Sequence, residues 1–508
     1  MHAAGRLGRV TSTTDPAPTS PTPTHPTPTH PLPEALNLID GKQLPSAADE
    51  TIRLVDPSTG EFLANVPAGC AADADAAVAA AKGARDLWAR TSPGDRAGAL
   101  KAAARRLRES VDELTEIQSR ESGKPPGGSR GGVMAGIETI EQYAELGPLH
   151  RGQSLQGNWG ATDLMVFEPR GVAVVLTPWN DPIAISAQLV AAALVAGNPV
   201  VFSPSERTPL SGIRFAEIVA AELPPGVLNV ALGDRRVGQP LVEHADVSLV
   251  LHIGSSATGR SIAAACAATG AHAVLEGGGK DPCLVDADVD PTWAASQAAL
   301  GAFANTGQIC TSVERIYVHR DIAEPFIAGL IDEAGQQVLG NALDDATTMG
   351  PMVDEAQRAV VDRHVRDAVA AGAEIRCGGE VPEGAGSFYP PTVLVGCTPE
   401  MAVMREETFG PVAAVQIVDS FDDALAAASV SDFGLAATVL TADLDHAQQA
   451  WRELPVGTVK INAVFGGAPG GSATPGPGSG QGFGYGPELL DECSRVKVVH
   501  LEPAPRRT

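Results

Sequence analysis

The sequence predicts an α/β protein with two doubly wound parallel-sheet domains and a small additional β element. Its 508 residues are too many for one ordinary core and indicate two or three domains. Hydrophobic residues make up 44% of the chain, which is enough to fill such cores. From Gly171 onwards, strand-like and helix-like segments alternate, and this alternation is typical of a parallel sheet covered by helices.

Residues 1–33 form a Pro/Thr-rich tail that we expect to be disordered or polyproline-like. Its prolines remove backbone donors, and its threonines offer almost nothing to bury. A recognition tail is one interpretation, and a dispensable extension or a misassigned start codon is the one we favour.

The next segments predict a scaffold of small strands and helices. Short apolar pieces between residues 37 and 68 alternate with Asp-Gly, Asp-Pro and Thr-Gly pairs, which predicts strands joined by turns. Apolar residues at three- and four-residue spacing then predict helices over 71–90, 93–122 and 132–146. A glycine-containing polar stretch follows and leads into the strand-like segment 164–167.

The alternating region predicts two α/β halves. In the first, the expected strands are 171–176, 199–202, 227–231, 247–253 and 272–275, with helices at 182–196, 209–222, 237–244 and 257–269. In the second, the expected strands are 282–285, 315–319 and 412–418, with helices at 292–304, 322–338 and 355–371. The Gly- and Pro-rich stretch 465–486 predicts a loop.

Charge and cysteine usage narrow the classes of function. The formal net charge of −25 argues against nucleic acid or an anionic membrane as partner. The seven cysteines show no CxxC pair and no histidine cluster, so we expect no metal site, no disulfide framework and a reducing cytoplasm. No apolar run reaches membrane-spanning length, and the N-terminus lacks the apolar core of a secretory signal.

Cys310 is the candidate nucleophile because it lies in a small, glycine-flanked setting. A partly desolvated cysteine near a helix N-terminus or a positive charge can be held as a reactive thiolate. The competing interpretation is a small buried hydrophobe, which is the usual role of an isolated cysteine in an Ala-rich chain.

Two further residues carry the chemistry that such a nucleophile needs. Glu276 ends an apolar run and precedes three glycines, so burial would raise its pKa toward that of a general base. The alternative is a carboxylate that caps a Gly-rich turn. Asn180 follows Pro178 and Trp179 after another apolar run, where its side-chain amide could donate to an oxyanion. By itself the stretch could equally be a turn.

Four stretches together resemble the aldehyde dehydrogenase superfamily, and they occur in the order found in that family. They are Pro178-Trp179-Asn180, Glu276 with Gly278-Gly279-Lys280, Asn305 to Cys310, and Glu406 to Val412. The likeness runs from about Asn37 to Val499. It implies an NAD(P)-dependent, non-acylating oxidoreductase that converts an aldehyde into a carboxylic acid.

The resemblance also implies a mechanism. The Cys310 thiolate would attack the aldehyde, with the oxyanion held by Asn180 and the Cys310 backbone N–H. After hydride transfer to the nicotinamide, Glu276 would deprotonate the water that hydrolyses the thioester. Coenzyme-A-acylating relatives generally lack this base, so Glu276 favours hydrolytic release.

Coenzyme contacts are implied at ten positions: Thr177, Pro178, Trp179, Ser203, Glu206, Gly238, Gly254, Ser255, Glu407 and Phe409. The turn Gly254 to Gly259 opens an expected helix, whose free N–H groups can meet a pyrophosphate, although Gly-x4-Gly alone is a weak signal. The Glu206 carboxylate would accept bonds from ribose hydroxyls and repel a 2′-phosphate, which favours NAD over NADP.

Three departures from the family pattern bear on this site. Ser203 replaces a lysine that holds the ribose in most members, which puts the preference between NAD and NADP in doubt. His252 and Ile253 stand where Phe and Thr are usual, and a simple repacking of the strand would explain both.

By resemblance, the domains would be an NAD-binding domain over 34–147 and 168–275, a catalytic domain over 276–462, and a bridging element over 148–167 and 463–508. The bridging element would make homodimers or homotetramers, and the Gly-rich loop would border the substrate mouth.

The substrate stays open at this level. Asp181 stands where many members have an aromatic residue lining the tunnel, and the helix after it lacks an arginine for an anionic aldehyde, although Arg106 could substitute. Two other classes of function remain: a cysteine-dependent esterase or hydrolase, and a non-catalytic scaffold on the same fold.

Overall fold

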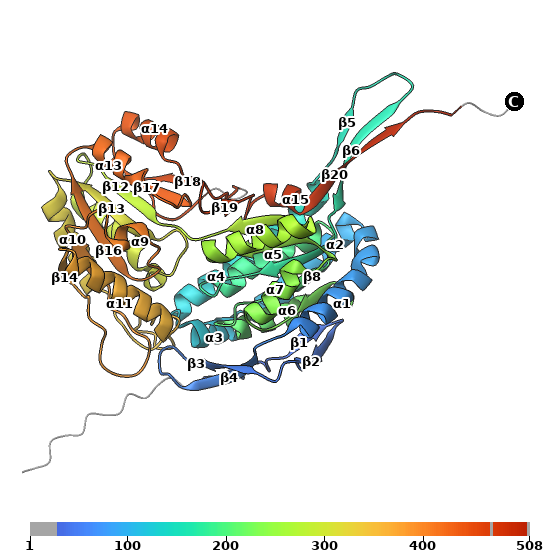
Figure 1. The fold of residues 1–508 in the computed structure, drawn as a ribbon, viewed down its shortest axis with the longest axis horizontal. Coiled ribbons are helices and arrows are strands. Elements are labelled where there is room, and N and C mark those ends of the chain that lie inside the picture. The colour runs from blue at the N-terminus through green and yellow to red at the C-terminus, as the bar shows by residue number, and fades with distance from the viewer. Residues whose placement is uncertain (1–27, 468–470, 505–508) are drawn as a thin grey trace, which may run out of the picture.

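The computed structural model describes residues 28–467 and 471–504, arranged as two large parallel sheets and a projecting β arm (Figure 1). The mixed α/β architecture with parallel sheets confirms the predicted fold class. Most of residues 1–33 and part of the loop 465–486 lie outside the described residues. The last residues of the predicted tail pack on the scaffold, since the backbone N–H groups of Thr29 and His30 both donate to Glu116 at 3.0 Å.

The first large sheet has eight strands. Their order is β19 (Gly480–Gln481), β11 (His272–Glu276), β10 (Val247–Ile253), β7 (Val172–Leu176), β8 (Val200–Ser203), β9 (Leu228–Val230), β1 (Asn37–Ile39) and β2 (Lys42–Leu44). The five strands from β11 to β9 are parallel, as predicted from the alternation. The chain reverses direction across the sheet between β7 and β10, and such a switch point is where open parallel sheets bind ligands.

Helices cover both faces of this sheet. They are α1 (Ala71–Arg90), α2 (Pro93–Glu109), α3 (Val111–Ser122), α4 (Pro126–Leu146), α5 (Pro182–Val195), α6 (Pro209–Ala220), α7 (Arg235–Glu243) and α8 (Ser256–Thr269). Alternate residues of β10 enter two separate cores: Leu249 and Leu251 pack with α2 to α6, and Val250 packs with α1, α7 and α8. The helix expected over 93–122 is divided in two at Ser110.

The second large sheet has seven strands. Their order is β14 (Glu374–Cys377), β15 (Thr392–Val395), β16 (Val412–Val418), β13 (Val313–His319), β12 (Asp281–Val285), β17 (Ala436–Leu440) and β18 (Thr458–Ile461). All pair in parallel except β14 with β15. The associated helices are α9 (Pro291–Phe303), the 3-10 turn η2 (Ala304–Gly307), α10 (Ala323–Gly335), α11 (Glu355–Ala370), α12 (Ala402–Arg405), α13 (Phe421–Ala428) and α14 (Leu444–Glu453).

Two smaller sheets complete the fold. A three-stranded antiparallel arm of β5 (Gln153–Leu155), β6 (Thr162–Pro169) and β20 (Ser494–Leu501) projects from the body, with η1 (Gly147–Leu149) and α15 (Glu488–Glu492) at its base (Figure 1). A hairpin of β3 (Thr51–Val55) and β4 (Phe62–Pro67) forms the other. The described residues of the stretch 465–486 form a loop apart from β19, which adds an antiparallel edge strand to β11.

Candidate active site

Cys310 lies in a tight, strongly bonded loop between η2 and β13. Asn305 and Thr306 both have left-handed backbone angles, with φ of 50° and 58°, which side-chain-bearing residues rarely adopt. The Gln308 side chain fixes the loop, because its carboxamide oxygen accepts from Val353 N–H at 2.9 Å. The Ser312 hydroxyl donates to the Gly307 carbonyl at 3.0 Å. The nucleophile candidate is therefore held on a rigid support.

Glu276 ends β11 and interacts with the Cys310 thiol. The three glycines that follow it allow close approach of neighbouring groups, as the sequence predicts. A Cβ on Gly278 would come 2.4 Å from a Glu407 oxygen, and a Cβ on Gly279 would come 2.6 Å from the Cys310 carbonyl. The Gly279 N–H also donates to Glu407 at 3.0 Å. Because these glycines have no side chains, the carboxyl groups of Glu276 and Glu407 can approach the Cys310 thiol.

Burial sets the protonation states of these groups. It raises the pKa of Glu276 to about 7, against the opposing effect of a hydrogen bond with Cys310. Burial also raises the pKa of Glu407 to about 7, and nearby Glu314 adds to this shift. The pKa of the Cys310 thiol is raised well above its usual value, first by desolvation and then by Glu276, Asp281 and Glu407. This environment favours the neutral thiol, so a base is needed to ionise it.

Asn180 joins the same loop from the end of β7. One N–H of its side-chain amide donates to the Gln308 carbonyl at 3.1 Å, and Asn305 donates to the Asn180 carbonyl at 3.2 Å. A primary amide has two N–H donors, so the second one is available to a ligand beside Cys310. The amide is buried and its orientation is fixed by the catalytic loop itself.

One cavity of about 260 Å³ brings most of the predicted site together. Its lining includes the predicted residues Pro178, Trp179, Asn180, Gly254, Ser255, Cys310, Glu407 and Phe409. It also includes four residues that the sequence did not indicate: Ile185, Arg207, Gln357 and Val360. The cavity lies at the switch point between β7 and β10 and reaches the second sheet.

The aromatic side chains of this cavity come from both sheets. The Trp179 and Phe409 rings meet edge to face with centroids 5.2 Å apart, and the Arg207 guanidinium lies 5.5 Å from the Trp179 ring. Arg207 also pairs with Asp354 at 3.3 Å, while the Gln357 amide donates to the Phe409 carbonyl at 3.3 Å. Along the chain, Arg207 is 28 positions from Trp179 and Gln357 is 52 positions from Phe409, so local patterns gave no signal for these partners.

The remaining predicted coenzyme positions lie outside that cavity. Gly238 lines a separate one of about 390 Å³ between α7 and α8, together with Leu176 and Thr258. Thr177 is buried with its hydroxyl 3.3 Å from that of Ser186. Ser203 is buried at the end of β8, in register with Leu176, and Glu206 lies half-buried in the turn that follows.

A buried ion pair supports the Glu407–Phe409 turn from below. The Lys280 ammonium lies 2.5 Å from Glu314, and both side chains are almost fully buried. Glu314 accepts the backbone N–H groups of Thr408 and Phe409, each at 2.8 Å. Lys280 is part of a motif in the sequence, whereas no local pattern indicates Glu314, which lies 34 residues further along the chain.

The Gly-rich loop reaches the base from the other side. A Cβ on Gly484 would come 2.7 Å from a Glu276 oxygen, and the Gly484 carbonyl accepts from Gln188. At the beginning of α5, Asp181 pairs with Lys124 at 3.0 Å. Arg106, considered as a partner for anionic aldehydes, instead pairs with Glu222 at the surface.

Across residues 28–467 and 471–504, no three His, Cys, Asp or Glu side chains gather in a way that could hold a metal ion. Within the same ranges, no helix has the length and apolar character needed to cross a membrane.

Residues 44–499 match the model of the aldehyde dehydrogenase family. The chain is 39% identical to betaine aldehyde dehydrogenase 1 of Rhizobium meliloti (strain 1021) over 441 residues, covering 85% of this chain and 89% of that protein. An NAD-dependent aldehyde dehydrogenase from Sinorhizobium meliloti superposes with a TM-score of 0.90 at 34% identity, covering 94% and 97% of the two chains. An NADP-dependent enzyme from E. coli also gives 0.90, at 30% identity and 92% and 98% coverage.

Proposed function

This chain belongs to the aldehyde dehydrogenase family, and we propose that Cys310, Glu276 and Asn180 carry out the aldehyde oxidation for which that family is named. The observation that carries this assignment is that Cys310 and Asn180 line one cavity shared by both sheets, while Glu276, the hydrogen-bond partner of the Cys310 thiol, lies behind it. The reaction converts an aldehyde into its carboxylic acid with NAD or NADP.

The coenzyme site fits a dinucleotide. The cavity lies at the switch point of the first sheet and includes Gly254 and Ser255, directly before the N-terminus of α8. Free N–H groups at such a position suit a pyrophosphate. The second cavity, with Gly238, lies between α7 and α8 and includes Thr258 in the first turn of α8, so one extended ligand would occupy both. Glu206, at the end of β8, favours NAD, with NADP as the alternative.

We assign the first proton transfer to Glu276. Its pKa of about 7 leaves a large carboxylate fraction at neutral pH, and the Cys310 thiol is its hydrogen-bond partner. The S–H bond breaks as Glu276 takes the proton, and the thiolate forms a C–S bond to the aldehyde carbon. The carbonyl electron pair moves to oxygen, and the second N–H of Asn180 and the Cys310 backbone N–H donate hydrogen bonds to the resulting oxyanion. Bound NAD(P) supplies the acceptor for the hydride that the substrate carbon must lose.

Glu276 acts again in product release. Once its first proton has passed to solvent, the Glu276 carboxylate takes a proton from water and the resulting hydroxide attacks the thioester carbon. The C–S bond then breaks to leave the carboxylic acid and the Cys310 thiolate, which takes the proton back from Glu276. A base with a pKa near 7 suits this step, because it is ionised often enough to act and basic enough to take a proton. Glu407 and Phe409 are assigned to hold the nicotinamide half of the coenzyme, supported by Lys280 and Glu314.

Betaine aldehyde is the first substrate to test, because the curated relative at 39% identity is a betaine aldehyde dehydrogenase. Asp181 adds a carboxylate near the mouth, although Lys124 neutralises it.

We also propose the domain division 34–147 with 168–275, 276–462, and 148–167 with 463–508, which follows the membership of the three main sheets apart from β19. The seven unpaired cysteines support a cytoplasmic location.

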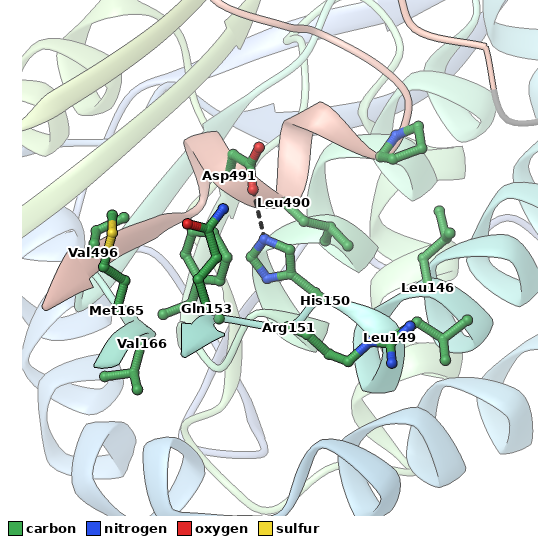
Figure 2. A pocket seen from close by; sticks show the side chains of 13 residues that line it. Leu146, Leu149, His150, Arg151, Gln153, Met165, Val166, Leu490, Asp491 and Val496 are labelled. Carbon is green, nitrogen blue, oxygen red and sulfur yellow. Dashed lines mark hydrogen bonds and ion pairs between the residues drawn. The ribbon is translucent and has the colours of Figure 1, made fainter. Parts of the chain in front are cut away.

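A second copy of this chain is the proposed partner of the β arm. A cavity of about 350 Å³ at its base is lined by His150, Phe167 and Leu490, and His150 pairs with Asp491 across it at 2.7 Å (Figure 2). Val498 on β20 is 70% exposed and Trp159 beside β6 is fully exposed, so the arm presents apolar surface that a partner would bury. A homodimer or homotetramer follows, and its mass in solution tests the assignment.

The decisive experiment measures reduced-coenzyme formation at 340 nm with NAD and NADP against betaine aldehyde and aliphatic, aromatic and carboxylated aldehydes. We expect turnover that disappears in Cys310→Ala and persists in Cys377→Ala, a matched change at another half-buried cysteine. Ester hydrolysis without any coenzyme-dependent oxidation would instead favour the hydrolase. A folded protein with neither activity would favour the scaffold.

A further inference from the structure

Arg207 is a cationic side chain in the cavity that contains Cys310 and the Gly254–Ser255 turn. Among the described residues that line this cavity, it is the only lysine or arginine. It lies in the turn between β8 and α6, which follows the strand next to β7 in the first sheet. The cavity therefore has one guanidinium group in its wall, at the switch point where a dinucleotide is proposed to bind.

The guanidinium is only weakly held in the structure. Its Nε lies 3.3 Å from Oδ2 of Asp354, directly before α11, and its central carbon lies 5.5 Å from the centre of the Trp179 ring. The Arg207 backbone N–H donates to Ser205, but within residues 28–467 and 471–504 the guanidinium donates no hydrogen bond. Both members of the ion pair are about one-third exposed, and such pairs contribute little to stability. An anionic ligand can therefore replace Asp354 at low cost.

The rest of the turn lacks the charge that a diphosphate needs. Gly254 and Ser255 precede α8, whose first N–H groups and positive dipole end suit a phosphate but carry only partial charge. Ser203, at the end of β8, adds a hydroxyl and no charge.

A guanidinium supplies what the turn lacks. It is always charged, and its planar set of N–H donors matches pairs of phosphate oxygens. Arg207 shares the cavity wall with Gly254 and Ser255, so the turn and the guanidinium can contact the same ligand group. The two together form a complete anion site, with backbone donors on one side and a full positive charge on the other.

We propose that Arg207 is a coenzyme-binding residue, whose guanidinium leaves Asp354 and donates hydrogen bonds to the pyrophosphate of the dinucleotide at the Gly254–Ser255 turn. This inference rests on the proposed function, because it requires the coenzyme to occupy this cavity. Asp354 belongs to the second α/β unit, so coenzyme binding exchanges a contact between the two units for a contact with the ligand. Since NAD and NADP share the pyrophosphate, Arg207 serves both equally.

Binding calorimetry with adenosine, ADP, NAD and NADP tests the inference without relying on turnover. We expect Arg207→Gln to weaken binding of ADP, NAD and NADP by the same factor of about ten, the loss of charge-assisted hydrogen bonds, and to leave adenosine binding unchanged. Arg207→Lys keeps a charged donor and should stay within about threefold of wild type. The matched control is Arg214→Gln on α6, whose side chain is 31% exposed and pairs with Glu113 away from the cavity, and it should bind as wild type does.

A change at Asp354 separates ligand binding from a structural role. Asp354→Asn keeps an oxygen for the Gln357 N–H, which Asp354 accepts at 2.8 Å, but it removes the charge that competes for Arg207. We expect this variant to bind ADP and NAD about two- to threefold more tightly than wild type, since the lost ion pair is a weak one. Added salt should also weaken ADP binding more in wild type than in Arg207→Gln.

Each other outcome contradicts the inference in a distinct way. Equal losses in Arg207→Gln and Asp354→Asn would reduce Arg207 to its ion pair. A loss for NAD without a loss for ADP would place the guanidinium at the nicotinamide ribose, and a loss confined to NADP would place it at the 2′-phosphate. Unchanged ADP and NAD binding in Arg207→Gln would overturn this inference alone. If wild type itself bound neither ADP nor NAD, the proposed coenzyme site would fail as well.

Discussion

Replacing Glu276 with glutamine should stabilise the folded protein at pH 8 and should also remove the general base. Burial raises the pKa of this carboxyl from 4.5 to about 7. Holding the ionised form in the folded state therefore costs about 3 kcal/mol, at 1.36 kcal/mol for each pKa unit. Glutamine has nearly the shape of the protonated carboxyl and carries no charge, so the variant avoids that cost.

The sign of the effect depends on pH in a defined window. Because the folded pKa lies above the unfolded one, the folded state binds more protons between pH 4.5 and 7, and the contribution of Glu276 to stability falls as pH rises through this range. Below pH 4.5 both states are protonated and the variant gains nothing. Above pH 7 its advantage is complete.

Thermal unfolding midpoints of wild type and Glu276→Gln at half-unit steps from pH 4.5 to 8.5 measure this difference. Glu145→Gln, at an exposed position, serves as the control for the substitution itself. We expect the midpoint of Glu276→Gln to exceed that of wild type progressively from pH 5 to 7 and then to stay above it by a constant amount. A pH-independent difference, or a wild type that is more stable at pH 8, would refute a carboxyl held near pKa 7 by burial.

Three further substitutions test the site from different sides. Asn180→Ala removes the oxyanion donor, so kcat should fall about 10²- to 10³-fold with little change in coenzyme affinity, measured by initial rates and calorimetry. Gly484→Ala places a methyl 2.7 Å from a Glu276 oxygen, and single-turnover kinetics should show both a slower hydride-transfer burst and slower thioester hydrolysis, because Glu276 serves both steps. Lys280→Met leaves Glu314 buried without its cation and should cost about 3–5 kcal/mol of folding stability. The added change Glu314→Gln should partly restore it, because glutamine is neutral and keeps a carbonyl oxygen for the Thr408 and Phe409 N–H groups.

Regular periodicity in the sequence was enough to predict most of the first sheet. The strand expected over 247–253 is β10, with the same limits, and the helix expected over 71–90 is α1. These elements alternate or repeat their apolar residues over many positions, so the local pattern carries the information. The division of the second helix at Ser110 was missed because the apolar spacing continues across it.

Elements defined by distant partners could not be predicted in this way. The strands β14, β15 and β18 have only four residues each, too few for a distinctive pattern. The strand β19 consists of Gly480 and Gln481, and only its pairing with β11 makes it a strand. A glycine-rich segment gives no local sign of such pairing, since the information lies in the edge it meets.

The same distinction applies to the site. Residue types and motif order indicated Cys310, Glu276 and Asn180, and the geometry brings them to one loop. The protonation state of the thiol was not predictable, because it depends on carboxyl groups that approach only in the folded chain. The pair between Lys280 and Glu314 was hidden for the same reason.

The carboxyl groups around Cys310 explain how the free enzyme can keep its nucleophile as an unreactive neutral thiol. Glu276, Asp281 and Glu407 all have raised pKa values, and each opposes ionisation of the thiol. A permanent thiolate would be open to alkylation and oxidation, whereas a neutral thiol is much less so. Because Glu276 both suppresses ionisation and provides the base, proton transfer to it relieves the repulsion as it creates the nucleophile. Glu276 therefore loses its own charge in the same step that activates the thiol. This requires a buried carboxyl with a raised pKa, and the same burial destabilises the folded protein before substrate binds.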